Sequence, residues 1–163
     1  MASNPAFANV DTLVLISPNF APADPKAGWI TRPGGPLLLR VAVGETRSWQ
    51  PHNEQQAKYW STRYPSAIVI EVMRLVDLAH DMLPLDIGAS VLTLLSPDDQ
   101  VVSPQATLKA MERINSPAMR VAEITGVGDP SQHVLAGDIL SPDSTDDVLR
   151  QIVDFVRAGS SRH

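Results

Sequence analysis

The sequence predicts an α/β protein with a parallel sheet of about three strands, flanking helices and a long insertion after the first strand. Two short apolar runs, at residues 12–16 and 91–95, both end abruptly in a Ser-Pro turn. Such runs are typical of strands buried on both faces of a parallel sheet. Segments with helical periodicity follow the second run, and residues 20–36 have little periodicity, which indicates a lid or a binding loop.

Composition limits the class of protein. The 163 residues are the size of one domain, and a net charge of −5 without a Lys/Arg cluster argues against nucleic acid as the main partner. The absence of cysteine excludes disulfides, thiolate catalysis and cysteine-ligated zinc. No apolar run approaches the roughly 20 residues of a spanning helix, and the first residues do not have the pattern of a signal peptide. We therefore expect a cytoplasmic protein without a membrane span.

Two helices are expected before the second strand. Residues 53–60 predict a short helix that carries Tyr59 and Trp60, whose rings would pack within the lid or line a pocket. Residues 65–82 predict the clearest helix, because Ile70, Met73, Val76, Leu78 and Ala79 form an apolar stripe near helical spacing. The run at 37–43 fits a helix turn or a short strand equally well.

Three further elements follow the second strand. Residues 104–114 predict an amphipathic helix with Leu108, Met111 and Ile114 turned inward. Residues 119–124 alternate apolar and polar side chains, as an outer strand with one solvated face does. The last helix, at 144–156, is expected to begin with Ser144 or Thr145 as its N-cap and to end at Gly159.

Polar residues suited to catalysis follow two successive strands. Asp98 and Asp99 follow the run at 91–95, and His133 lies in the loop after the alternating strand. A strand–helix–strand unit brings such loops to the same edge of the sheet. A carboxylate that accepts the Nδ1 proton of a histidine fixes its tautomer, so that the other ring nitrogen can act as a general base.

Plainer roles are open for the same residues. An aspartate after Ser-Pro is a common turn residue, and a histidine in a Gly/Pro loop is often merely solvated. Acidic residues near His133 (Asp129, Asp138 and Asp143) match no metal-ligand spacing, so capping and turn roles are expected for them. The pair of glycines at 126 and 128 opens no helix, so a dinucleotide fingerprint is absent.

This order of elements resembles the last third of an α/β-hydrolase. The residues that carry the likeness are the acid loop at 94–102, the histidine loop at 128–133 and the helix at 147–156. In that family the order along the chain is Ser, Asp or Glu, then His. The resemblance implies Asp99 as the triad acid, with Asp98 as the fallback, and His133 as the base. It also implies a lid at about 20–64 and no cofactor.

The family's nucleophile motif is missing from the chain. The sequence contains no Gly-x-Ser-x-Gly elbow, because the segment at 88–92 lacks the second glycine and precedes a strand. Residues 1–10 resemble the end of the helix that follows the elbow. The acid loop has Ser96 in place of the usual glycine. The chain thus resembles the C-terminal half of a hydrolase, as a single partial domain over 1–163.

We therefore expect the C-terminal part of a serine hydrolase that acts on small carboxylic esters. Asp99 and His133 would serve a nucleophilic serine outside the chain, and the chain alone would be inactive. The alternative is a non-catalytic α/β domain that binds a small molecule or a protein partner. In either case the exposed edge of the first strand is expected to allow self-association.

Overall fold

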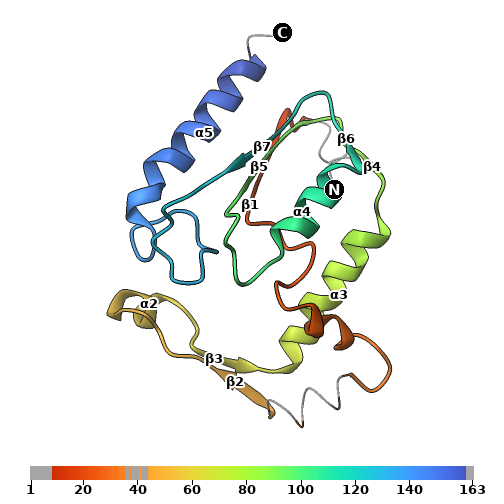
Figure 1. Cartoon of the computed structure of the whole chain (residues 1–163), viewed down its shortest axis with the longest axis vertical. Helices are drawn as coiled ribbons and strands as arrows, with labels where there is room; N and C mark the ends of the chain where they lie inside the picture. The colour runs from red at the N-terminus through yellow and green to blue at the C-terminus, as the bar shows by residue number, and fades with distance from the viewer. Residues whose placement is uncertain (1–8, 36, 38–40, 42–43, 161–163) are drawn as a thin grey trace.

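A computed structural model describes residues 9–35, 37, 41 and 44–160 of the chain (Figure 1). The predicted helix end at 1–10 lies almost wholly outside the described residues. The run at 37–43 also lies mostly outside them. Among the described residues, no helix has both the length and the apolar character needed to cross a membrane.

Three parallel strands form the centre of the molecule. They are β1 (Thr12–Ile16), β5 (Ser90–Leu95) and β7 (Met119–Glu123), and their order in the sheet is β1-β5-β7. Both neighbours of β5 run in its direction, so the carboxyl ends of all three strands lie at one edge of the sheet. The predicted fold class is confirmed, with β7 as an outer strand.

Helices cover both faces of this sheet. Alternate residues of β5 point to opposite faces, and Leu92 and Leu94 pack with Phe155 of α5 (Pro142–Ser160). On the other face Thr93 donates its hydroxyl hydrogen to Met111 Sδ, at 3.0 Å, in α4 (Pro104–Met111). Because β5 is buried on both sides, the turn that follows it is fixed to the core.

The helix α3 (Ala67–Asp81) corrects part of the predicted stripe. Met73 and Val76 are buried as expected, but Leu78 is exposed. Large apolar side chains also lie on the outward face of this helix and just past its end: Ile68, Val72, Leu75, Leu78 and Met82. With apolar residues on both faces, periodicity alone could not identify the face that packs inward.

Two other helix predictions were wrong in detail. In α4 the buried residues include Thr107, Ala110 and Met111, whereas Leu108 is exposed. Ile114 lies beyond α4 in the short strand β6 (Ile114–Asn115), which pairs with β4 (Leu85–Asp86).

The last helix begins earlier than predicted. Pro142 is its first residue, a position where the missing N–H of proline costs nothing and its fixed φ suits the helix. Ser144 and Thr145 lie inside the first turn, and both hydroxyls donate to main-chain carbonyl oxygens upstream, at Leu135 and Ser141 respectively.

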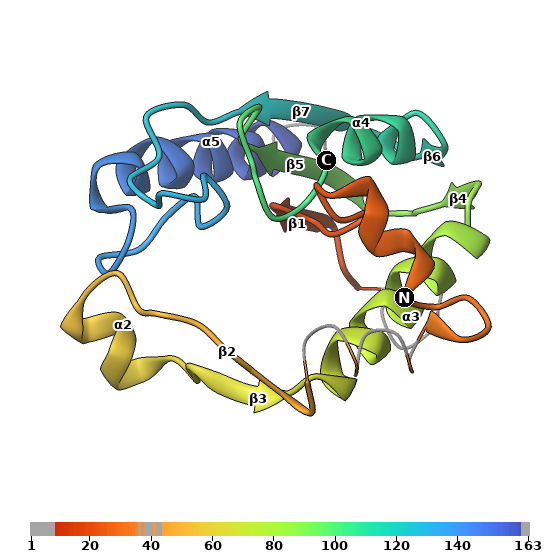
Figure 2. The ribbon, with the colours of Figure 1, turned by 60° about the horizontal axis from the view of Figure 1, so that its bottom comes forward.

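The insertion after β1 forms small elements of its own. It contains a 3-10 helix η2 (Pro25–Trp29), an antiparallel pair of strands, β2 (Thr46–Ser48) and β3 (Arg63–Pro65), and helix α2 (Glu54–Tyr59) between them. Asn53 caps α2 by accepting the N–H of Gln56 at 2.8 Å. Figure 2 shows α2 and the strand pair standing apart from the sheet, with α2 beside the loop that precedes α5.

Candidate active site

The turn after β5 is built around the side chain of Asp99. Its Oδ1 accepts the N–H groups of Val101 and Val102, at 2.8 and 2.9 Å, and its own N–H donates to the carbonyl of Ser96. Only 2% of this side chain is exposed. A carboxylate buried in this way is stable because its oxygens are hydrogen-bonded. The turn therefore leaves the second oxygen, Oδ2, for another partner.

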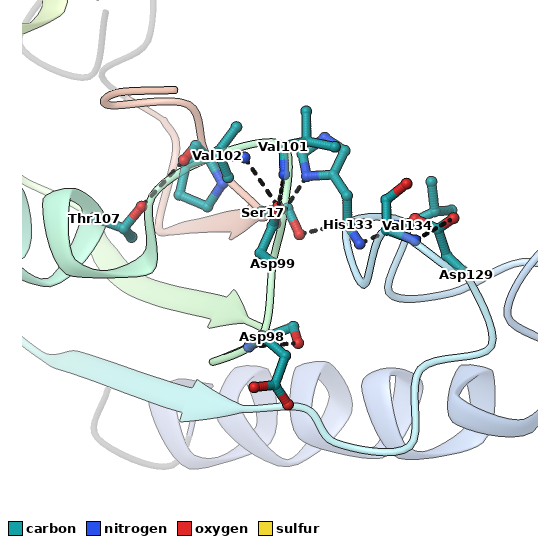
Figure 3. A network of polar contacts seen from close by, with 12 residues as sticks. Ser17, Asp98, Asp99, Val101, Val102, Thr107, Asp129, His133 and Val134 are labelled. Carbon is teal, nitrogen blue, oxygen red and sulfur yellow. Dashed lines mark hydrogen bonds and ion pairs between the residues drawn. The ribbon is translucent and has the colours of Figure 1, made fainter. Parts of the chain in front are cut away.

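That partner is His133, which lies in the loop after β7. The distance from Asp99 Oδ2 to His133 Nδ1 is 2.8 Å (Figure 3). The imidazole is 30% exposed, so the ring is only partly covered by the protein. In this arrangement the hydrogen lies on Nδ1 of the neutral ring, and Nε2 has a free lone pair that can accept a proton.

Asp98 does not share this contact. Its side chain is exposed and directed away from His133 (Figure 3). Its main-chain N–H donates to the buried hydroxyl of Ser96 at 3.3 Å, so the serine found in place of the family's glycine takes part in the turn.

Two residues beside His133 were not identified from the sequence as parts of the site. Ser17 follows β1, and its hydroxyl donates to the main-chain carbonyl of His133 at 2.7 Å. The buried Asp129 accepts the main-chain N–H groups of His133 and Val134 with Oδ2, both at 3.0 Å. In the sequence, Ser17 has only the pattern of a residue that ends a strand. The signal for Asp129 was present in the sequence, since an aspartate followed by a loop often accepts N–H groups a few residues on.

The other histidines do not join the site. His52 and His80 are exposed, and His80 contacts the carbonyl of Phe20 through Nε2. His163 lies outside the described residues. Within the part of the chain that the structure describes, no group of three or more His, Asp or Glu side chains could hold a metal ion.

The serines near the sheet are not arranged as nucleophiles. Ser90 lies at the amino end of β5, five residues and therefore about 16 Å from the carboxyl edge at a rise of about 3.3 Å per residue. The hydroxyl of Ser17 is directed to the carbonyl of His133 rather than to its ring. The described residues thus bring a carboxylate and an imidazole into contact, while Ser17 and Ser90 are not directed at that ring.

Comparisons with known proteins support the resemblance at the level of fold. No family model matches the chain, and no curated protein matches it. Several solved structures are similar. Three of them are a monoacylglycerol lipase from Paleococcus ferrophilus (19% identity, TM-score 0.61, 91% of this chain), mouse alpha/beta hydrolase domain-containing protein 10 (18%, 0.54, 91%) and a soluble variant of monoglyceride lipase from Saccharomyces cerevisiae (8%, 0.56, 90%).

The match covers only part of each relative. The chain corresponds to 59%, 53% and 55% of the three solved chains, in the same order. At these identities the likeness concerns the course of the backbone, and it agrees with the parallel order β1-β5-β7 and the helices on both faces. The chain therefore has a partial α/β-hydrolase fold.

Proposed function

We propose that this chain supplies the acid and the base of a serine hydrolase that acts on carboxylic esters. The observation that carries the proposal is the hydrogen bond between Asp99 Oδ2 and His133 Nδ1 at the carboxyl edge of the sheet. The nucleophilic serine would belong to a polypeptide segment outside residues 1–163. The similarity to two lipases named for monoacylglycerol or monoglyceride supports an ester substrate.

The roles follow from the geometry. As the serine oxygen attacks the ester carbonyl, Nε2 of His133 takes the hydroxyl proton, and Asp99 stabilises the imidazolium through Nδ1–H. The tetrahedral intermediate then collapses, the bond to the alcohol breaks, and Nε2 gives the proton to the departing oxygen. Water attacks the resulting acyl-serine in the same way, which releases the acid and restores the serine.

The insertion at about 20–64 would cover the acyl site as a lid. One contact supports this role, because Asn53 Nδ2 donates to the carbonyl of Ile139 at 2.8 Å, in the segment between His133 and α5. The insertion is thereby joined to the same part of the chain that carries the proposed base.

The pair can be tested by reading the tautomer of His133. In Asp99→Asn, the amide oxygen can still accept the hydrogen bonds from the N–H groups of Val101 and Val102. The amide NH₂ group then faces His133 Nδ1. Because NH₂ is a donor, Nδ1 should become the acceptor and the ring hydrogen should move to Nε2. Nitrogen NMR of the ¹⁵N-histidine-labelled chain, at mildly alkaline pH, should show that the protonated and unprotonated ring nitrogens have changed places. The signals of His133 are identified as those that are missing in His133→Gln.

Asp98→Asn is the matched control, since it makes the same chemical change on the adjacent exposed side chain. It should leave the tautomer unchanged. If Asp99→Asn also leaves it unchanged, the Asp–His pair does not exist in solution and the proposed function fails.

In a polypeptide that carries both this chain and the serine, His133→Ala should lower kcat for a short-chain ester by about 100-fold to 10,000-fold.

A second candidate function is non-catalytic binding of another protein, with a second copy of this chain as the first partner to test. The observation that favours it is the outward apolar face of α3, which includes Ile68, Val72 and Leu75. Contiguous exposed apolar surface is typical of interaction sites. In the described part of the chain β1 pairs only with β5, so its outer edge could extend such an interface.

A further inference from the structure

The main chain of His133 is held at both of its polar groups. Its N–H donates to Asp129 Oδ2 at 3.0 Å, and its carbonyl accepts the hydroxyl of Ser17 at 2.7 Å (Figure 3). Together with the bond from the ring to Asp99, these contacts come from the loops after β1, β5 and β7. We propose that Ser17 and Asp129 are positioning residues that keep the imidazole in register with Asp99, an inference that rests on the proposed function.

Asp129 is built to fix this part of the loop. Its carboxylate is buried and accepts N–H groups from Ser131 with Oδ1, at 3.3 Å, and from His133 and Val134 with Oδ2. Hydrogen bonds to an ionised group are roughly twice as strong as those between neutral groups. Two of the three donors are His133 and the residue after it. The carboxylate therefore fixes the backbone from which the imidazole projects.

Ser17 reaches the same residue from the opposite side of the site. Its own N–H donates to the carbonyl of Leu94 at 2.9 Å, which ties it to the central strand. Its φ of 44° lies in the left-handed region, where glycine would be free of strain and serine is not. The contact that its hydroxyl makes with the carbonyl of His133 gives a physical reason for a serine at this position.

The test uses a readout that a purely structural role would not move. The hydrogen on Nδ1 of His133 should give a low-field proton signal in water, because it lies in a short bond to a carboxylate. Ser17→Gly removes the hydroxyl and relieves the φ strain, so the thermal unfolding midpoint should change little. Exchange of the Nδ1 proton with water should nevertheless become about fivefold faster, because the net free energy of one hydrogen bond corresponds to about a fivefold change in an equilibrium constant.

Asp129→Asn should accelerate exchange of the Nδ1 proton by at least as much as Ser17→Gly does. The substitution weakens two hydrogen bonds, because the N–H groups of His133 and Val134 both donate to Asp129 Oδ2. Asp138→Asn is the control, since Asp138 lies in the same loop with its side chain exposed. It should change nothing. If Asp129→Asn does not fold, Ser17→Gly decides the matter alone.

The outcomes separate the two proposals. If Asp99→Asn abolishes the low-field signal while Ser17→Gly leaves its exchange rate as in the unmodified chain, the positioning role is overturned and the proposed function stands. If Asp99→Asn leaves the signal in place, the proposed function itself is wrong. Faster exchange in Ser17→Gly at an unchanged unfolding midpoint supports positioning by the hydroxyl.

Discussion

Asp99 and His133 differ in exposure, and this difference suits the chemistry proposed for them. The carboxylate is almost completely buried, while the ring is 30% exposed. A buried acid keeps its hydrogen bonds free of competition from water, and a partly exposed ring can be reached by a substrate. The proximity of the two residues was predicted because parallel strands bring successive loops to one edge. The contacts of Ser17 and Asp129 could not be predicted in this way, since they depend on backbone positions within the loops.

The conformation of the loop that carries His133 also depends on Gly128, where the backbone leaves no room for a side chain. A Cβ at this position would lie 2.5 Å from the carbonyl oxygen of Leu140, which belongs to the backbone and cannot move away alone. Gly128→Ala should therefore lower the free energy of unfolding by about 1–3 kcal/mol, as overpacking typically does. Urea unfolding measures this change.

Gly88→Ala provides the matched control, because a Cβ there meets nothing within 4 Å and its φ is not in the left-handed region. It should be neutral or stabilise by up to about 1 kcal/mol through the unfolded state. Equal effects at the two glycines would contradict the packing argument for Gly128.

Among the helices and strands, α3 is unusual because large apolar side chains are exposed on its outward face. Leu75 is 65% exposed at the centre of its outward apolar face, whereas the next residue, Val76, is buried. A contiguous exposed apolar face on a helix is typical of an interaction site. This face is the surface on which the proposed binding of a second copy can be tested.

Leu75→Glu should weaken self-association of the chain. A Leu side chain contributes about 1.5–3 kcal/mol when buried, so the dissociation constant should rise by about tenfold or more. Sedimentation equilibrium over a range of concentrations measures this constant. Leu149→Glu makes the same change on the exposed face of α5 and should have no effect. A chain that stays monomeric at all concentrations excludes a second copy as the partner of α3.

Elements were predicted correctly where the pattern of apolar residues in the sequence matches the burial of those residues in the fold. The apolar runs at 12–16 and 91–95 both form strands, as predicted, but only the second is buried on both faces. The first is half-buried and ends at the exposed Ile16. Leu78 and Leu108 were placed inward wrongly, because the packed face of a helix is set by its neighbours rather than by its own period. The strands β2 and β3 were missed because their residues are exposed or partly exposed and show no alternation of apolar and polar side chains.

At the scale of the whole molecule, the proposed acid and base lie on a chain that contains no Gly-x-Ser-x-Gly motif, and the hydroxyl of Ser17 is directed to the main chain of His133 rather than to its ring. The isolated chain should therefore not react with a fluorophosphonate probe, because an unactivated serine hydroxyl is a weak nucleophile. Mass spectrometry of the treated chain checks this. Stoichiometric labelling of any serine within residues 1–163 would contradict an external nucleophile.

The coding DNA upstream of the Met1 codon gives an independent check of the same proposal. An in-frame segment that encodes Gly-x-Ser-x-Gly should supply the missing nucleophile. Joined to that segment, the chain should react with the probe at the elbow serine, and His133→Ala should abolish the reaction. If the joined protein remains unreactive, non-catalytic binding becomes the leading function.

The pairing of β1 with β5 joins two strands that are separated by the whole insertion and by α3. The sheet therefore requires closure of a very long loop, and the entropy of closure grows only with the logarithm of loop length. Doubling or halving the insertion would change this term by only about 0.6 kcal/mol. Evolution could thus replace or resize the segment beside the site with little effect on the stability of the sheet. Folding itself should be slow, because these neighbouring strands are so far apart along the chain.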